Sequence, residues 1–230
     1  MLIRPPDPAT PVTAVVIVLN GGRAHSLAPA SRRNLAYQRM IPFTREVHRA
    51  TRSHGVAVWQ LRYRVRGWNG ADQDPVRDAR WALRRVRTGH PGVPVVLIGH
   101  SMGGRTALYV GGDDPAIAVC ALAPWIGPDD PYRQLAGRLV VIAHGDRDRM
   151  TDPGASRRFA QEAAAAGARV ARFDVTGDAH AMLRRAADWH ALARDTVCYA
   201  LGISTPAPLE RALAAPAPER FAVPLPTSVE

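Results

Sequence analysis

Lysine is absent from this sequence. All 30 basic residues are therefore arginines, and against 20 acidic residues they give the 230-residue chain a formal net charge of +10. A basic chain invites a nucleic-acid-binding role, but such surfaces usually concentrate their charge on one element with interleaved aromatic side chains. Here the arginines are spread along the whole chain and accompany abundant alanine, which indicates GC-rich coding. We therefore expect no nucleic-acid partner, although the positive field would favour anionic small substrates.

Cysteines and long apolar runs are also scarce. Cys120 and Cys198 are too few for a disulfide framework, and Cys120 lies in an apolar run where a buried thiol is expected. No stretch approaches the roughly 18 consecutive apolar residues of a membrane span. The N-terminal MLIRPPDPATP lacks the apolar core of a secretory signal. These absences predict a cytoplasmic protein with no membrane partner, and they leave the oligomeric state open.

Apolar runs alternate with segments of helical spacing from residue 12 to residue 200. Continuous runs rich in valine and isoleucine are typical of strands buried on both faces of a parallel sheet. The alternation predicts an α/β fold: a mostly parallel central sheet of about six strands with helices on both faces. The expected strands are 12–19, 56–63, 95–98, 117–123, 139–143 and 170–175. The expected helices are 34–54 (kinked or divided by Pro42), 74–89, 105–110, 155–166 and 181–200.

The texture of the sequence changes at residue 205. Prolines recur every few residues from there on, and apolar residues lose their period. We therefore divide the chain into one domain at 1–204 and a Pro/Ala-rich tail at 205–230. The tail is expected to be extended or disordered, with Leu213 and Phe221 as candidate docking points.

The most informative stretch is VPVVLIGHSMGG at residues 93–104. Ser101 stands between Gly99 and Gly103, directly after a buried strand and before a predicted helix. The glycines allow strand and helix to pass close together around a serine in a strained turn. The order of strand, G-x-S-x-G and helix resembles the nucleophile elbow of the α/β-hydrolase superfamily, in particular its small, cap-poor serine hydrolases of the dienelactone-hydrolase and serine-aminopeptidase kind.

This resemblance implies a catalytic triad in the chain order serine, acid, histidine. A serine needs a base to take its proton, and the base needs a carboxylate to hold its tautomer. His180, in a short loop directly after the strand at 170–175, is the expected base, and His190 in the following helix is the alternative. His100 and His144 precede key residues in their motifs and are expected to shape turns rather than to transfer protons.

Asp148 is the expected acid. It ends the segment His-Gly-Asp-Arg-Asp, which resembles the H-G-x-x-D turn of the superfamily. Asp146 in the same turn is the competitor, and its other role would be to accept backbone N–H bonds there. Asp129 or Asp130, after the preceding strand, would be a less common position for the acid.

The oxyanion of the tetrahedral intermediate needs hydrogen-bond donors. In the superfamily one donor is the backbone N–H that follows the nucleophile, here Met102, and the second comes from a loop after an early strand. That loop is Asn20-Gly21-Gly22-Arg23 in this sequence, so Gly22 or Arg23 is the expected second donor. Asn20 stands where the superfamily often has histidine.

The short loop after Pro124 leaves no room for a cap, so an open and shallow substrate site is expected. His25, Trp68, Trp125 and Met182 are the candidate lining residues, and for each tryptophan packing in the core is an equal alternative.

The sequence therefore predicts a serine hydrolase that cleaves a small carboxylic ester or thioester through an acyl-enzyme on Ser101. An acyltransferase, an aminopeptidase or amidase on the same triad, and a non-catalytic binding protein remain as alternatives. No metal-ligand spacing, phosphate loop or dinucleotide fingerprint is visible, so neither a metal nor a cofactor is expected.

Overall fold

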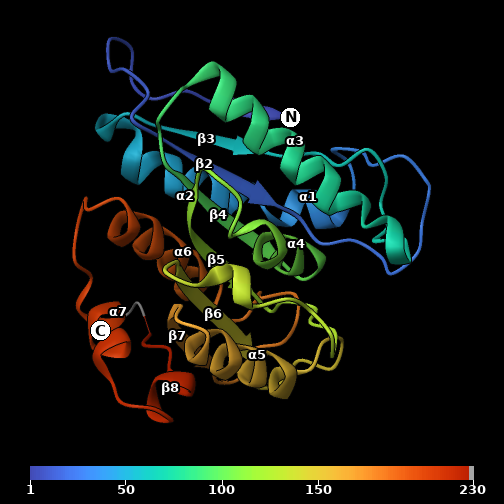
Figure 1. Ribbon diagram of the computed structural model, residues 1–230, viewed down its shortest axis with the longest axis vertical. Helices are drawn as coiled ribbons and strands as arrows, with labels where there is room; N and C mark the ends of the chain where they lie inside the picture. The colour runs from blue at the N-terminus through green and yellow to red at the C-terminus, as the bar shows by residue number, and fades with distance from the viewer. Residues whose placement is uncertain (228–230) are drawn as a thin grey trace.

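One eight-stranded sheet organises the computed structural model, which describes residues 1–227. The strand order is β1-β3-β2-β4-β5-β6-β7-β8 (Figure 1), and every neighbouring pair is parallel except β1 with β3. The strands are β1 (Leu2–Arg4), β2 (Ala14–Leu19), β3 (Val56–Gln60), β4 (Val95–His100), β5 (Ala116–Leu122), β6 (Leu139–Gly145), β7 (Arg169–Val175) and β8 (Val223–Pro224).

Helices cover both faces of this sheet, as the alternating sequence pattern predicts (Figure 1). The α-helices are α1 (Leu35–Arg39), α2 (Ile41–Thr51), α3 (Asp74–Gly89), α4 (Met102–Val110), α5 (Pro153–Ala165), α6 (Ala186–Ala200) and α7 (Ala207–Ala214). Short 3-10 turns are η1 (Arg52–His54), η2 (Gly70–Asp72), η3 (Arg133–Leu135) and η4 (Glu219–Phe221). Between β5 and β6 the only helical element is η3, so the described chain carries no large cap there.

The continuous apolar runs reflect burial on both faces of the strands. Along β2, Ile17 and Leu19 pack into the core under α3, α4 and α5. Val16 and Val18 point to the opposite face and pack with α2, α6 and α7. All four side chains are fully buried, which is why β2 shows no polar alternation.

The six predicted strands correspond to β2–β7, and the structure adds two at the sheet edges. Edge strands β1 and β8 contain 3 and 2 residues and are only partly buried, so neither forms an apolar run. Pro42 lies at the start of α2 and divides the predicted 34–54 helix at Met40. The closing helix begins at Ala186 rather than at 181, because residues 181–185 form a loop that buried polar groups hold.

The expectation of an extended or disordered tail is corrected by the described part of residues 205–230. This segment forms α7, η4 and β8, and β8 pairs with β7 beside the sheet (Figure 1). Pro208 falls in the first turn of α7, where proline fits a helix, so the proline content does not prevent folding. Phe221 is 5% exposed and Leu213 is partly buried, so both proposed docking points contact the domain. No helix within residues 1–227 has the length and apolar character that crossing a membrane requires.

Phe221→Ala tests whether this segment belongs to the folded domain. We expect the substitution to lower the free energy of unfolding by about 3 kcal/mol, because it removes a buried aromatic side chain. Urea denaturation followed by fluorescence measures the change. Leu27→Ala, at a residue that is 75% exposed, is the control and should change stability little. Equal, small effects of both substitutions would contradict the packed arrangement.

Candidate active site

The turn between β4 and α4 holds Ser101 in an unusual backbone conformation, with φ 55° and ψ −119°. Non-glycine residues rarely occupy this region, so the surrounding structure must impose it. A Cβ on Gly99 would lie 2.1 Å from the carbonyl oxygen of Gly103, and a Cβ on Gly103 would lie 2.4 Å from that of Leu19. Both positions therefore require glycine, because β2, β4 and α4 pack backbone against backbone around the serine.

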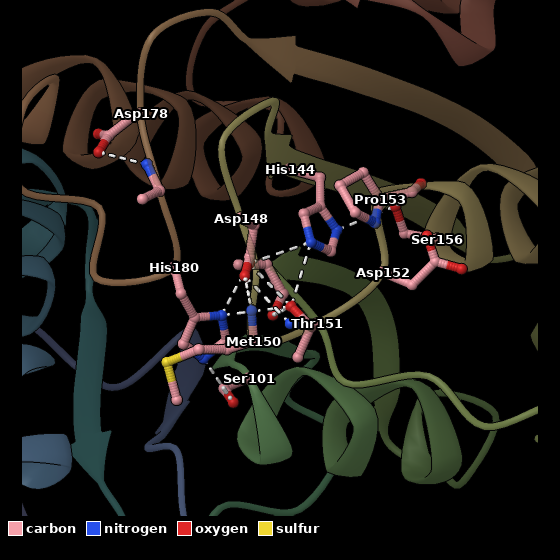
Figure 2. A network of polar contacts seen from close by, with 12 residues as sticks. Ser101, His144, Asp148, Met150, Thr151, Asp152, Pro153, Ser156, Asp178 and His180 are labelled. Atoms are coloured by element: carbon pink, nitrogen blue, oxygen red, sulfur yellow. Dashed lines mark hydrogen bonds and ion pairs between the residues drawn. The ribbon is translucent and has the colours of Figure 1, made fainter.

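Parallel strands bring the predicted residues together at one edge of the sheet. Ser101 follows β4, Asp148 follows β6 and His180 follows β7. His180 Nε2 lies 3.0 Å from Ser101 Oγ, and His180 Nδ1 lies 2.8 Å from Asp148 Oδ2 (Figure 2). The three side chains form one hydrogen-bonded row although they are up to 79 residues apart in the chain.

Asp148 is buried at the end of this row and is held as a carboxylate. Burial alone would raise its pKa, but hydrogen bonds from His144 and His180 and from the backbone N–H groups of Thr151 and Met150 outweigh burial and hold the pKa well below its usual range. The Thr151 hydroxyl also donates to Oδ2, at 2.8 Å. The acid is therefore ionised across the neutral pH range and fixed in direction.

A second buried carboxylate, Asp178, organises the loop that carries His180. Asp178 is 2% exposed, and it accepts hydrogen bonds from the backbone N–H groups of Ala179, Arg184 and Arg185 and from the indole N–H of Trp189. Burial opposes ionisation, but these donors outweigh it and lower the pKa of Asp178. The loop is thereby anchored on the residue two positions before the histidine.

His100 supports the same loop from the elbow side. Its Nε2 lies 2.9 Å from the carbonyl oxygen of His180. A carbonyl can only accept, so Nε2 carries the proton. Burial, together with the nearby His180 ring, lowers the pKa of His100 to about 3, so this imidazole stays neutral. His100 is therefore a support of the His180 backbone and not a proton carrier.

None of the alternative bases and acids takes part in this hydrogen-bonded row. His190 packs edge-on against Phe43 and contacts a guanidinium nitrogen of Arg39. Asp146 accepts from the backbone N–H of Gly177, as expected of a turn residue. Asp130 forms a two-pronged ion pair with Arg105 and accepts from the Tyr109 hydroxyl. Asp129 is exposed.

The conformation of the loop after β2 reduces the number of candidate oxyanion donors. The N–H of Arg23 donates to the carbonyl oxygen of Arg66 at 2.9 Å, so this residue is corrected from a candidate donor to a structural contact. Gly22 packs against the elbow so tightly that a Cβ there would lie 2.3 Å from Met102 Cε. Met102 is the first residue of α4, where helical N–H groups have no partner within the helix. Gly22 and Met102 remain the candidate pair.

Two of the four predicted lining residues belong to the core. Met182 is fully buried and its carbonyl oxygen accepts from Arg39. Trp68 is 4% exposed, and its ring packs edge-to-face with Trp125 and against the guanidinium of Arg105. Both side chains pack against other residues of the protein and leave almost no surface for a ligand. His25 is exposed and Trp125 is partly buried, so these two keep surface that a ligand can touch.

Sequence reasoning missed several groups beside the triad. His144 and Thr151 both contact Asp148, and the Asp178 anchor was not considered. An aspartate two residues before the histidine in a glycine-containing loop was the available signal for Asp178, since such carboxylates bind nearby backbone N–H groups. Met150 was missed as well. It is 77% exposed, and its backbone N–H donates to Asp148 Oδ1 at 2.8 Å.

Comparisons with known proteins bear on the fold and on the segment around the elbow. A family model described as serine aminopeptidase, S33, matches residues 54–143, a segment that contains the elbow but ends before Asp148 and His180. No curated protein sequence matches the chain.

Solved structures match over most of the chain. Est1E from Butyrivibrio proteoclasticus superposes with a TM-score of 0.64 at 12% identity, over 87% of this chain and 93% of that one. A serine hydrolase without lid from Xanthomonas campestris gives a TM-score of 0.58 at 19% identity, over 89% of each chain. This chain has the α/β-hydrolase fold. Thermogutta terrifontis esterase 2, phosphorylated by paraoxon, shares the α/β-hydrolase fold with a TM-score of 0.63 at 22% identity, over 89% of each chain.

The buried carboxylates Asp148 and Asp178 predict how the stability of this protein depends on pH. Asp148 and Asp178 have pKa values in the folded protein below their ordinary value. Their contribution to stability is therefore present above the ordinary carboxyl pKa of about 3.9 and is lost as the pH falls through and below that value.

We expect Asp178→Asn to lower the free energy of unfolding at pH 7 by about 1–3 kcal/mol, because an amide cannot accept all the bonds of the carboxylate. The same substitution should make the fall in stability between pH 6 and pH 3 shallower. Urea denaturation at a series of pH values measures both effects. Asp129→Asn, at an exposed carboxylate, is the charge-matched control. An unchanged pH dependence in Asp178→Asn would contradict the anchoring role.

Proposed function

We propose that this protein is a serine hydrolase that cleaves carboxylic esters or thioesters of small substrates through an acyl-enzyme on Ser101. The observation that carries the proposal is the hydrogen-bonded row from Asp148 through His180 to Ser101, with contacts of 2.8 and 3.0 Å. A serine becomes a useful nucleophile when a positioned base takes its proton, and this row supplies the base and its orienting carboxylate. The proposed chemistry needs no cofactor.

In the first half of the reaction, His180 Nε2 takes the Ser101 proton as Oγ bonds to the substrate carbonyl carbon. The carbonyl oxygen gains the negative charge and is stabilised by the N–H groups of Met102 and Gly22, each worth about 3 kcal/mol in such sites. Collapse of this intermediate breaks the bond to the alcohol or thiol, which takes the proton from His180. The acyl group is then an ester of Ser101.

In the second half, a water molecule replaces the departed alcohol or thiol. His180 takes a proton from the water as its oxygen bonds to the acyl carbon. Breakdown of the second tetrahedral intermediate returns that proton to Ser101 Oγ and releases the carboxylic acid. The positive imidazolium that forms in both halves is stabilised by the ionised Asp148.

The surroundings of the site favour esters over aminoacyl amides. An aminopeptidase must bind the α-ammonium group of its substrate, which calls for an available carboxylate. The buried carboxylates at this site, Asp148 and Asp178, are already occupied by donors from the protein. Met150 and Leu183 are apolar and 77% and 67% exposed. Met150 donates its backbone N–H to Asp148, and Leu183 follows His180 by three residues in sequence. These features support an uncharged acyl or alkyl group at the site.

An aminopeptidase or amidase remains the second candidate, because the matched family model carries that description. Turnover of p-nitrophenyl acyl esters and thioesters should exceed that of aminoacyl p-nitroanilides. Faster cleavage of the anilides would assign the protein to the second class. Formation of a new ester in the presence of an added alcohol would instead identify acyl transfer.

Ser101→Ala should abolish both ester turnover and covalent labelling by a fluorophosphonate or by paraoxon. Asp148→Asn should lower kcat by about 10⁴-fold, because the amide favours the wrong tautomer of His180. Mass spectrometry of the intact protein measures labelling, and spectrophotometry measures turnover. Ser53→Ala, at an exposed serine in η1, is the matched control and should keep both. Labelling that persists in Ser101→Ala would count against Ser101 as the nucleophile. A wild-type protein that neither reacts nor turns over would favour a binding protein.

A further inference from the structure

The proposed catalytic carboxylate contacts a second imidazole. His144 is fully buried, and its Nε2 lies 3.2 Å from Asp148 Oδ2. His180 approaches the same oxygen at 2.8 Å. Figure 2 shows the two rings on either side of the Asp148 carboxylate, one toward Ser101 and one away from it. The mechanism proposed above uses only the ring that faces the serine.

A hydrogen-bonded chain continues from His144 into the protein. His144 Nδ1 lies 3.0 Å from Ser156 Oγ, at the start of α5. Ser156 in turn contacts Nε of Arg172 at 3.0 Å. Arg172 is a fully buried guanidinium in β7, and it also donates to Asp174 at 2.7 Å and to the carbonyl oxygen of Phe221 at 3.0 Å. The chain therefore runs from a buried cation to the proposed catalytic anion.

The two ends of this chain fix the direction of its hydrogen bonds. A guanidinium only donates, so Ser156 Oγ must accept from Arg172. The Ser156 hydroxyl has one proton and two acceptors within reach, the carbonyl oxygen of Pro153 at 2.9 Å and His144 Nδ1 at 3.0 Å. Asp148 decides between them, because a carboxylate only accepts and His144 must therefore donate from Nε2. The bare Nδ1 then accepts from Ser156, while the Pro153 carbonyl accepts from Arg172. His144 consequently carries its own proton on Nε2 and donates it toward Asp148. The opposite tautomer would place a bare nitrogen lone pair 3.2 Å from a carboxylate oxygen.

We propose that His144 is a positioning residue: in its Nε2–H tautomer it accepts from Ser156, donates to Asp148 and limits how strongly that carboxylate binds His180. The kinetic part of this inference rests on the proposed serine hydrolase function. The tautomer itself does not, because it follows from the contacts alone.

Other groups around the two rings agree with these roles. The Thr151 hydroxyl donates to Asp148 Oδ2, and its oxygen lies 3.1 Å from His144 Nε2, where it can accept part of the same proton. Burial lowers the pKa of His144, so the ring stays neutral and does not act as a competing base. The groups that face His144 are thus Asp148, Thr151, Ser156 and Arg172.

His180 has a different set of neighbours. Its ring contacts Asp148, Ser101 and the Thr151 hydroxyl, and lies 4.8 Å from the ring of His100, centroid to centroid. A carboxylate that accepts a donor from a second imidazole attracts the first imidazolium less strongly. Removing the His144 donor should therefore strengthen the attraction between Asp148 and the imidazolium of His180.

The tautomer is tested directly by long-range ¹H–¹⁵N correlation spectra of the wild-type protein labelled with ¹⁵N-histidine. We expect His144 to show a protonated Nε2 and a bare Nδ1 between pH 6 and pH 8. In Ser156→Ala the lock on Nδ1 is lost, so the His144 signals should change while those of exposed His25 remain. A protonated Nδ1 in the wild-type protein would overturn the inference. No substrate is used, so this outcome is independent of whether the protein hydrolyses esters.

The kinetic consequence is tested on p-nitrophenyl ester turnover over pH 5 to 9. His144→Leu removes the donor, whereas the amide nitrogen of His144→Gln keeps a donor near the position of Nε2. We expect His144→Leu to lower kcat about tenfold and to move the acid limb of kcat/KM upward by about half to one pH unit. His144→Gln should stay within about threefold of the wild type, with its acid limb near the wild-type position.

Thr51→Val, which removes a buried hydroxyl bonded to the Val47 carbonyl in α2, controls for general loss of a buried polar group. It should leave the pH profile unchanged. If His144→Leu does not fold, Ser156→Ala carries the test, with a smaller shift in the same direction. Equal losses in His144→Leu and His144→Gln with an unmoved acid limb would mean that His144 only fills space, and would overturn the positioning role.

Discussion

Ser101 keeps its positive φ because β2, β4 and α4 approach one another too closely for a side chain at Gly99 or Gly103. Backbone strain of this kind costs on the order of 1–3 kcal/mol and persists only where packing imposes it. The packing here comes from the fully buried strands β2 and β4, and these strands fix the backbone of the turn that carries the serine. The same close approach places Gly22 against Met102 and so assembles both candidate oxyanion donors.

Two buried carboxylates then decide where the histidine lies. Asp148 hydrogen-bonds the ring of His180, and Asp178 accepts hydrogen bonds from the backbone of the loop that carries it. Charged groups are costly to bury unless hydrogen bonds satisfy them, and both aspartates are met by several donors. A buried anion on each side of a short loop leaves it little freedom, and this holds the imidazole in place toward Ser101.

The C-terminal segment contributes to the same polar interior. Its Phe221 carbonyl oxygen accepts from Arg172, and the backbone N–H of Leu225 donates to the carbonyl oxygen of Asp174. Arg172 is thereby satisfied on the side away from the site and presents Nε toward Ser156 and His144. The C-terminal segment, which the sequence predicts to be extended or disordered, therefore supplies a hydrogen-bond acceptor to the buried chain of polar groups that leads to Asp148.

The sequence alone determined the parallel sheet, the elbow, and the identity of Ser101, Asp148 and His180 as the residues that meet. Continuous apolar runs, the paired glycines and residues placed directly after strands are local signals, and the chain order supplied the rest. Only the tertiary structure decided that the N–H of Arg23 donates to the carbonyl oxygen of Arg66 and that Trp68 and Met182 are buried in the core. It also decided that residues 205–227 fold against the domain. It also gave His144 its place on Asp148, because the partners of a buried polar group come from elements distant in sequence and only packing brings them within hydrogen-bond range.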